Sequence, residues 1–345
     1  MAEATIPLKL TAKDFKSDQE VRWCPGCGDY AILAAVQQFM PELNIPRENI
    51  VFVSGIGCSS RFPYYMNTYG MHSIHGRAPA IATGLSVSRP DLSVWVVTGD
   101  GDALSIGGNH LIHALRRNVN LKILLFNNRI YGLTKGQYSP TSELGKITKS
   151  TPTGSADSPF NPLSLALGAE ATFVARTIDS DRKHLQSVLR AAAEHDGSAF
   201  IEIYQNCNIF NDGAFELLKD PGTKDDHLIR LEHGQPITFG AQGQFCVVHP
   251  AGGFGLSVRE TASVAPEDVL VHDATVDDPA YAFALSRLSG SDLGTTPIGV
   301  FRSVRRESYD TLVQEQLATA KAGATGTPEE MLSGLLASGD TWTIL

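Results

Sequence analysis

The sequence predicts an α/β protein built on a doubly wound parallel sheet with helices on both faces. Two apolar runs, residues 94–97 and 121–126, have the length and continuous hydrophobicity of parallel strands buried on both faces. Between them, 105–118 spaces its apolar residues as a crossover helix does. A right-handed strand, helix, strand unit brings the carboxyl ends of both strands to one edge of the sheet, where open α/β sheets bind ligands.

Length and composition limit the functions to consider. The 345 residues, 42% of them hydrophobic, suffice for one large or two ordinary domains. A net charge of −9 argues against nucleic acid as the default partner and is compatible with a soluble enzyme. Residues 1–20 have no apolar signal core, and no apolar stretch is long enough to span a bilayer. We therefore expect a cytoplasmic protein with no membrane association.

Polar residues directly follow the two predicted strands. The segment Gly99, Asp100, Gly101, Asp102 comes after the first strand, and Asn128 comes after the second. A carboxylate, an amide oxygen and a nearby backbone carbonyl are hard oxygen ligands of the kind Mg²⁺ prefers, and the glycines let a diphosphate approach the backbone. The spacing resembles the thiamine diphosphate motif. Ordinary turn residues are the alternative, whereas an EF-hand is excluded because its later ligand positions are missing.

The remaining segments continue the alternation of strands and helices up to about residue 208 and then become irregular. Asp29 is a candidate N-cap for the first helix. The expected helices are 30–40, 80–87, 163–167, 181–194, 280–288, 309–321 and 328–337. The further strands are 50–54, 171–176, 199–204 and 269–272, and the segment 298–302 has no assigned conformation. Residues 138–162 form a long loop, and 209–260 is irregular. This pattern divides the chain into an α/β domain, 1–215, and a C-terminal extension, 216–345, which we expect to be a subunit-interface arm.

Four of the five cysteines lie in predicted loops. Cys24 and Cys27 form a CxxC pair, and Cys58 and Cys207 each follow a predicted strand. Such a set suits Zn²⁺ or a four-iron, four-sulfur (4Fe-4S) cluster, although scattered buried thiols are the alternative and the CxxC pair alone also fits a redox disulfide. Cys246 lies in an apolar run and is expected to be a buried bystander.

Two further residues are candidates for ligand contacts. His75 precedes a predicted helix N-terminus and, with Arg77, makes an anion site or else has a capping or packing role. Lys135 follows the Asn128 segment closely and holds a substrate carboxylate or is a solvated surface lysine. The long loop after it has the length of a functional lid.

Taken together, the motifs resemble the β subunit of 2-oxoacid:ferredoxin oxidoreductases, most closely the 2-oxoglutarate type. The matching segments cover roughly residues 20–215 in the family's order. They are CPGCG at 24–28, GIGCSS at 55–60, HGRAPAIATG at 75–84, TGDGD at 98–102, FNNRIYGLTKGQ at 126–137 with SPT following, and Cys207.

The resemblance implies a thiamine diphosphate-binding α/β fold and assigns roles to residues. Cluster ligands near the thiazolium ring would be Cys24, Cys27, Cys58 and Cys207. Mg²⁺ on thiamine diphosphate would be held by Asp100, Asn128 and the backbone carbonyl of Ile130. Residues lining the cofactor would include Gly57, Cys58, His75, Gly99, Gly101 and Asp102. Lys135 resembles the family's substrate and cofactor contact, so Lys135 and His75 are the candidate catalytic residues.

The activity implied by the resemblance is the coenzyme A-dependent oxidative decarboxylation of 2-oxoglutarate to succinyl-CoA and CO₂, or its reverse, with electrons passed to ferredoxin. In such families the glutamate that activates the cofactor's aminopyrimidine comes from an α subunit, often fused to a γ domain, so this chain alone should be inactive. The alternatives are pyruvate or another 2-oxoacid as substrate, a non-redox thiamine enzyme, and a non-catalytic zinc-binding module.

Overall fold

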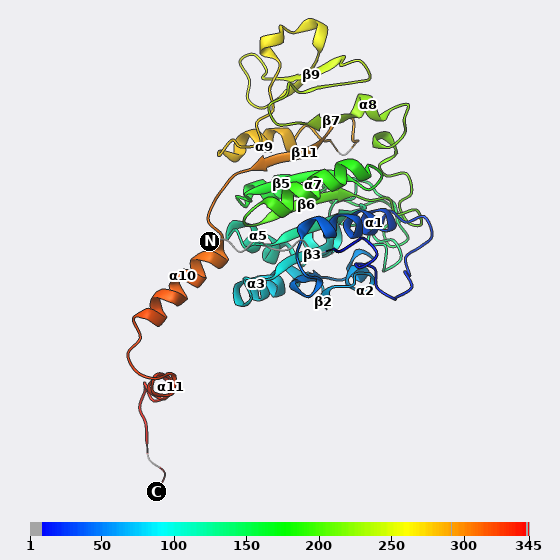
Figure 1. Ribbon diagram of the computed structural model, residues 1–345. Coiled ribbons are helices and arrows are strands. Elements are labelled where there is room, and N and C mark those ends of the chain that lie inside the picture. Colours follow the sequence, from blue (N-terminus) through cyan, green and yellow to red (C-terminus); the bar gives the residue numbers. More distant parts are fainter. Residues whose placement is uncertain (1–8, 291, 343, 345) are drawn as a thin grey trace.

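The computed structural model describes residues 9–290, 292–342 and 344. The first part of the polar segment 1–20, residues 1–8, lies outside the described residues. The described chain forms an α/β body around an eight-stranded sheet, a small three-stranded sheet at one end, and a helical segment that projects from the body (Figure 1).

The main sheet has the strand order β2-β1-β3-β4-β6-β5-β11-β7. Its strands are β1 (Ile50–Ser54), β2 (Tyr69–His72), β3 (Ser93–Gly99), β4 (Lys122–Asn127), β5 (Phe173–Ile178), β6 (Ala199–Tyr204), β7 (Leu228–Leu231) and β11 (Thr296–Ser303). The strands from β2 to β5 in this order are parallel, as the sequence predicts, and β3 and β4 are adjacent. β11 departs from the prediction because it pairs antiparallel with β5.

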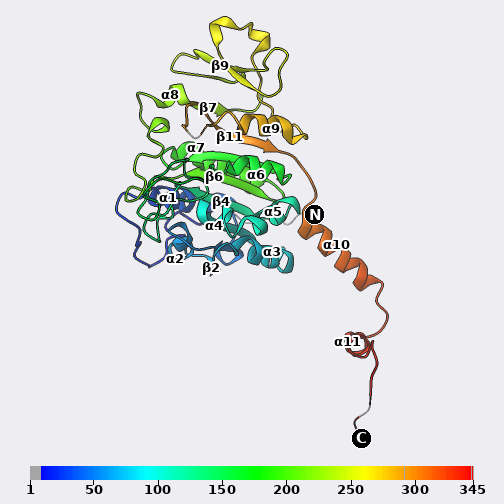
Figure 2. The same cartoon turned by 180° about the vertical axis from the view of Figure 1, so that it is seen from behind.

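Side chains that alternate along each strand build a separate hydrophobic core on each face of the sheet. In β1, Val51 and Val53 point into one core, whereas Ile50 and Phe52 point into the other. This period of two explains why every residue of β1 is buried. The first core packs against α3, α5, α6 and α9, and the second packs against α1, α2 and α7. Figure 2 shows the sheet from behind with helices on both sides.

The helices begin and end close to the predicted positions, with one break. They are α1 (Asp29–Phe39), α2 (Phe62–Tyr65), α3 (Ala78–Ser88), α4 (Asp100–Leu104), α5 (Gly108–Arg116), α6 (Pro162–Gly168), α7 (Arg182–Glu194), α8 (Lys224–His227), α9 (Pro279–Ser286), α10 (Tyr309–Ala322) and α11 (Pro328–Leu336). The expected helix 105–118 is shorter because the chain turns between α4 and α5, where Gly107 packs against Gly76 and a Cβ on Gly107 would lie 2.4 Å from the carbonyl oxygen of Asp102.

The C-terminal part of the chain corrects two predictions. The region 209–260 contains β7, β8 (Thr238–Phe239), β9 (Phe245–Val248) and β10 (Ser257–Glu260), and the last three form the small antiparallel sheet. The expected strand 269–272 makes only single bridges, through Val269 and Val271. Because β7 and β11 complete the main sheet, the division at residue 215 does not coincide with the edge of the α/β body.

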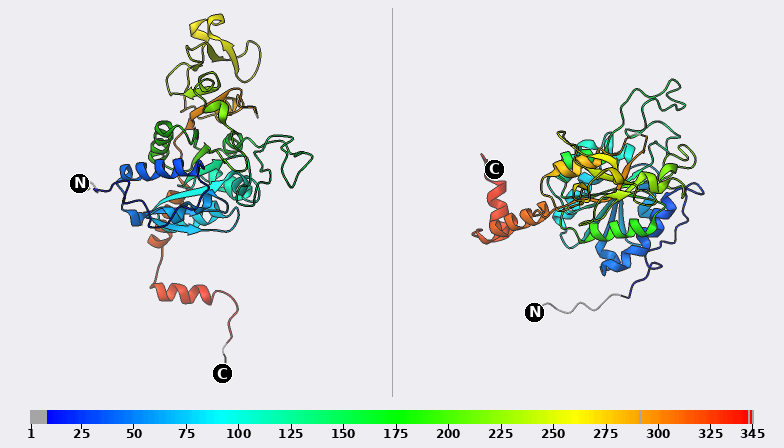
Figure 3. Two further views of the ribbon diagram at one scale, coloured as in Figure 1. Left: turned by 90° about the vertical axis from the view of Figure 1, so that its right-hand side faces the viewer. Right: turned by 90° about the horizontal axis from the view of Figure 1, so that it is seen from above.

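The end of the chain extends away from the body. Asp310 fixes the start of α10, because its buried carboxylate accepts hydrogen bonds from Ser86 Oγ (2.6 Å) and the backbone N–H of Asn120 (2.7 Å). Beyond residue 315 the described side chains of α10 and α11 are exposed, and Figure 3 shows both helices outside the body in two further views. No helix among the described residues has the length and apolar character needed to cross a membrane.

Candidate active site

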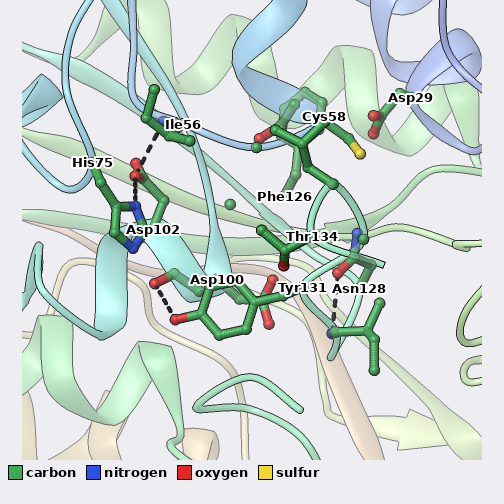
Figure 4. A pocket seen from close by; sticks show the side chains of 17 residues that line it. Asp29, Ile56, Cys58, His75, Asp100, Asp102, Phe126, Asn128, Tyr131 and Thr134 are labelled. Carbon is green, nitrogen blue, oxygen red and sulfur yellow. Dashed lines mark hydrogen bonds and ion pairs between the residues drawn. The ribbon is translucent and has the colours of Figure 1, made fainter. Parts of the chain in front are cut away.

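The carboxyl ends of β3 and β4 form one wall of a cavity of about 290 Å³. Gly99 pairs with Phe126 in the sheet, so the segments that follow these residues start side by side. Asp100 begins α4 and Asn128 follows β4, and both line the cavity, as the strand order predicts (Figure 4). The other lining residues are Asp29, Ile56, Gly57, Cys58, Ser59, His75, Gly99, Gly101, Asp102, Phe126, Ile130, Tyr131, Gly132, Leu133 and Thr134.

The carboxylate of Asp100 is 2% exposed and is held by two hydroxyls from the long loop. Ser139 Oγ and Thr141 Oγ1 donate to its Oδ2 at 2.5 and 2.6 Å. Burial raises the pKa of Asp100 despite these two donors. A buried carboxylate without a cation beside it is costly, and a divalent ion in the cavity would offset that cost. The donor set at this position therefore fits Mg²⁺.

The amide of Asn128 has a defined orientation. Its Nδ2 donates to Gln205 Oε1 at 2.9 Å, and its Oδ1 accepts from the backbone N–H of Ile130 at 3.2 Å. An amide oxygen has two lone pairs, so Oδ1 keeps one for a metal ion. Asp100 and Asn128 thus supply an anionic and a neutral oxygen to the same cavity, and oxygen donors of both kinds suit Mg²⁺.

Asp102 connects three segments around the cavity. Its Oδ2 accepts from Thr98 Oγ1 (2.7 Å), and its Oδ1 accepts from the backbone N–H groups of Ile56 (3.1 Å) and Gly76 (2.8 Å). His75 Nδ1 lies 2.6 Å from the same oxygen (Figure 4). The anion that His75 meets is thus Asp102 itself. This carboxylate fixes the cavity wall, and its predicted contact with the cofactor stays a prediction.

Gly101 is required by close packing. A Cβ at this position would lie 2.2 Å from Cε1 of Tyr131, whose hydroxyl donates to the carbonyl oxygen of Gly101 at 2.9 Å. The ring of Tyr131 therefore covers the backbone next to Asp100. Any larger residue at position 101 would move either the ring or Asp100.

A second cavity, of about 240 Å³, adjoins the first and is lined by all four candidate cluster ligands, Cys24, Cys27, Cys58 and Cys207. The other lining residues are Arg22, Trp23, Asp29, Arg61, Asn128, Gly132, Leu133, Lys135, Gln205, Asn208 and Phe210. Five residues line both cavities: Asp29, Cys58, Asn128, Gly132 and Leu133. The cavity of the thiols and the cavity of Asp100 and Asn128 are therefore separated by a shared wall.

Two of the thiols stay protonated unless a metal binds them. Burial raises the pKa of the Cys27 thiol, and burial raises that of Cys58 to about 12, so both hold their protons unless a metal replaces them. Among the described residues, no three His, Cys, Asp or Glu side chains are grouped to hold one metal ion.

Cys24, Cys246 and Lys135 differ in their exposure and in whether they line these cavities. Cys24 is exposed, and Cys246 is fully buried in β9 of the small sheet, which agrees with its expected bystander role. Lys135 lines the cavity of the cysteines and does not line the first cavity; its backbone is left-handed, with φ +76°. Its contact with a substrate carboxylate stays a prediction.

Sequence reasoning missed three kinds of contact. Ser139 and Thr141 were visible only as loop residues, although a hydroxyl-rich loop after the metal motif is a weak signal for ligands of a buried carboxylate. Gln205 follows β6 directly, and a polar residue at that edge was the available signal. Asp29 is not the N-cap of α1: the N-cap is Gly28, and Asp29 is the first helical residue.

Asp29 instead faces the wall between the two cavities. It is 1% exposed, and its Oδ1 has no hydrogen-bond partner among the described residues. Burial raises the pKa of this carboxyl to about 7. Figure 4 shows Asp29 and Cys58 on the same side of the first cavity, away from His75.

The fold and the site of this chain are similar to those of known thiamine diphosphate enzymes. Residues 55–203 match the family model "Thiamine pyrophosphate enzyme, C-terminal TPP binding domain". The fold also resembles a chain of 2-oxoglutarate:ferredoxin oxidoreductase from Magnetococcus marinus, solved with 2-oxoglutarate, coenzyme A and succinyl-CoA bound. The TM-score is 0.74 at 35% identity, covering 95% of this chain and 96% of that one. The predicted α/β fold of the thiamine diphosphate-binding type is confirmed.

Relatives in sequence narrow this class. The chain is 66% identical over 333 residues to the 2-oxoglutarate oxidoreductase subunit KorB of Mycobacterium tuberculosis, across 96% of this chain and 88% of that protein. It is 48% identical over 190 residues to the β subunit of 2-oxoacid:ferredoxin oxidoreductase 1 of Aeropyrum pernix, across 55% of this chain and 60% of that protein. The chain belongs to the family of 2-oxoacid:ferredoxin oxidoreductase β subunits, which confirms the resemblance drawn from its motifs.

Proposed function

We propose that the chain, together with an α subunit, catalyses the coenzyme A-dependent oxidative decarboxylation of 2-oxoglutarate to succinyl-CoA and CO₂, or the reverse, and passes two electrons one at a time to ferredoxin. The observation that carries this proposal is the shared wall between the cavity of Asp100 and Asn128 and the cavity of the four cysteines. A non-redox thiamine enzyme has no use for four thiols at that position.

The cofactor set follows from the donors. Asp100, Asn128 and the carbonyl of Ile130 would hold Mg²⁺ and through it the diphosphate of thiamine diphosphate, beside Gly57, Gly99 and Gly101. The four cysteines would hold a 4Fe-4S cluster. When bound, thiamine diphosphate supplies the carbanion and the electron sink that cleavage next to a 2-oxo group requires.

The chain's own residues position and shield this chemistry. Ser139 and Thr141 fix Asp100, and Asp102 ties His75 to the turn that carries Ile56. The loop that contains Ser139 reaches over the metal-binding edge, so its closure would exclude water from the reacting centre. Lys135 lines the cavity of the thiols and is proposed to meet a carboxylate of the substrate.

An α subunit is proposed because the cavity is incomplete. Among the described residues that line it there is no glutamate, and its acidic residues are Asp29, Asp100 and Asp102. Large apolar side chains are exposed near the His75 side of the cavity: Ile56 (44%), Ile74 (70%) and Ile106 (51%). Exposed apolar groups beside an open site are typical of a subunit interface. The relatives' designation as β subunits supports the same conclusion.

The substrate assignment rests on the relatives and on the match to a structure that contains 2-oxoglutarate and coenzyme A. The test is to co-express the chain with its α subunit and to measure coenzyme A-dependent reduction of a viologen dye with 2-oxoglutarate, pyruvate and a branched 2-oxoacid. We expect turnover mainly with 2-oxoglutarate and none from the isolated chain. Equal turnover with pyruvate would contradict the substrate, and activity of the chain alone would contradict the α subunit requirement.

The cluster assignment has its own test. The complex purified without oxygen should be brown and should bleach with dithionite, and iron analysis should give four irons per chain. A colourless complex that contains zinc would contradict it and would favour a structural metal site. Cytoplasmic location and the absence of nucleic acid partners stay predictions.

A further inference from the structure

The side chain of Gln205 contacts both Asn128, a proposed metal ligand, and the thiol of Cys27. It follows β6 directly and is 1% exposed. Its backbone N–H donates to the carbonyl oxygen of Asn127 at 2.9 Å, which continues the pairing of β6 with β4 beyond the last strand residue. The side chain is thereby anchored at the wall between the two cavities.

Both N–H groups of the Gln205 carboxamide donate hydrogen bonds, and its oxygen accepts one. Nε2 donates to the carbonyl oxygen of Asn206 at 2.6 Å and to Cys27 Sγ at 3.2 Å. Oε1 accepts from Asn128 Nδ2 at 2.9 Å. One rigid amide therefore joins the metal-binding amide to the thiol of a candidate cluster ligand.

The direction of these bonds is fixed by chemistry. The carbonyl of Asn206 can only accept, so it requires Nε2 on its side and Oε1 on the opposite side. Oε1 in turn requires the NH₂ group of Asn128, and this leaves Asn128 Oδ1 toward Ile130 N–H and the metal position. Turning either amide over would set two acceptors against each other.

We propose that Gln205 is a positioning residue with two effects: it orients Asn128 Oδ1 toward Mg²⁺, and its N–H raises the reduction potential of the cluster by hydrogen bonding to the Cys27 sulfur. The inference rests on the proposed cofactors. An N–H dipole beside a ligating sulfur stabilises the reduced cluster, which carries one more negative charge. A partner that orients a metal ligand typically changes metal affinity when it is removed.

Two variants separate these effects. Gln205→Met keeps the length of the side chain and removes both interactions. Gln205→Glu keeps an acceptor for Asn128 Nδ2 and replaces the donor to Cys27 with a carboxylate oxygen. The matched control is Gln37→Met, because Gln37 is also buried (6% exposed) but donates to the carbonyl oxygen of Tyr65 at 3.0 Å.

The measurements are made on the complex with its α subunit and do not depend on turnover. A redox titration followed by electron paramagnetic resonance gives the midpoint potential of the cluster. Titration of Mg²⁺ at saturating thiamine diphosphate, followed by the change in circular dichroism on cofactor binding, gives the metal affinity.

For Gln205→Met we expect Mg²⁺ affinity to fall about 10-fold to 100-fold. We also expect the reduction equilibrium to shift about tenfold toward the oxidised cluster, which is about 59 mV for a one-electron couple. Gln205→Glu should lower the potential at least as far while keeping most of the Mg²⁺ affinity. Gln37→Met should change neither quantity.

The outcomes separate this inference from the proposed function. A wild-type complex without an iron–sulfur signal overturns the proposed cluster and this inference with it. A wild-type complex with a cluster whose potential and Mg²⁺ affinity respond no more to the Gln205 substitutions than to Gln37→Met overturns the role of Gln205 alone. If Gln205→Met loses its cluster during purification, the potential of Gln205→Glu decides.

Discussion

The carboxyl edge of the main sheet and the C-terminal segment 309–342 differ in how their side chains are partnered. At the edge, Asp100, Asp102 and Asn128 are all hydrogen-bonded within the chain. In α11, Leu332, Leu335 and Leu336 are 56%, 71% and 78% exposed, and a nine-residue helix is marginal in water without tertiary contacts. The chain therefore satisfies the polar groups of the sheet edge by itself and leaves the apolar side chains of α11 exposed.

The comparison shows which contacts a single subunit must complete. A buried polar group costs free energy unless it is paired, so the polar edge has to be satisfied as the chain folds. Exposed leucines carry no unpaired polar group, so the chain can fold with them in water. Their burial against another subunit would add stability on assembly.

The buried pair Arg176–Glu202 tests how strictly the sheet must pair its charges. The two side chains are 1% and 0% exposed, and Nε lies 2.6 Å from Oε2. Glu202→Leu leaves Arg176 buried without its anion and should cost about 3–5 kcal/mol in urea unfolding. The surface pair of Arg190 and Glu42 is the control, and breaking it should cost less than about 1 kcal/mol. Equal losses of unfolding free energy for the two pairs would contradict the expectation that a buried charge in the sheet must be paired.

His195 extends the comparison to pH. It is 8% exposed near the opposite ends of the strands, and burial lowers its pKa to about 4 from 6.5. The folded state then binds fewer protons than the unfolded state between these values, so stability falls as pH drops from about 6.5 to about 4, by on the order of 3 kcal/mol. Urea unfolding of wild type and His195→Gln across this range measures it. A parallel pH dependence in both proteins would assign the loss to other groups.

Asp100→Asn separates the stability cost of the buried carboxylate from its proposed role in binding Mg²⁺. The variant removes the charge that Mg²⁺ needs, so Mg²⁺-dependent binding of thiamine diphosphate should weaken by about 100-fold or more, as measured by calorimetry. Without Mg²⁺ the variant should be at least as stable as wild type, because burial raises the pKa of this carboxyl. Asp91→Asn, at an exposed carboxylate paired with Arg89, should change neither value. Unchanged cofactor binding would refute the metal assignment.

Cys246→Ala tests whether the fifth cysteine is separate from the cluster. The side chain is fully buried beside Val248 and Val269 in the small sheet, so its loss should cost about 1 kcal/mol. Colour and iron content should stay as in wild type, whereas Cys58→Ala should lose iron. Loss of iron in the Cys246 variant would contradict the bystander role.

Removal of residues 324–345 tests the other side of the comparison. Because α11 is exposed, urea unfolding of the remaining chain should change by less than about 0.5 kcal/mol. We expect weaker assembly with other subunits, measured by analytical ultracentrifugation, in line with the proposed interface arm. A large loss of stability in the truncated chain would show that the segment supports its own body.

The sequence predicted the parts of the fold that follow from local pattern. Apolar runs marked β1, β3, β4 and β6, and the residues after β3 and β4 lie side by side because adjacent parallel strands share an edge. It did not predict β7 and β11, which are separated in the sequence by the small sheet and α9. β11 joins the main sheet by pairing with β5, and β7 joins it by pairing with β11; no local period encodes these pairings.

The candidate site divides in the same way. Asp100, Asn128, His75 and the four cysteines were identified from the sequence by residue type, spacing and family resemblance, and the structure places them around two adjoining cavities. Only the tertiary structure showed what holds them: Ser139, Thr141 and Gln205 act across 39, 41 and 77 residues. Strands and turns are specified by neighbours in the chain, whereas the partner of a buried polar group is decided by which segments folding brings together.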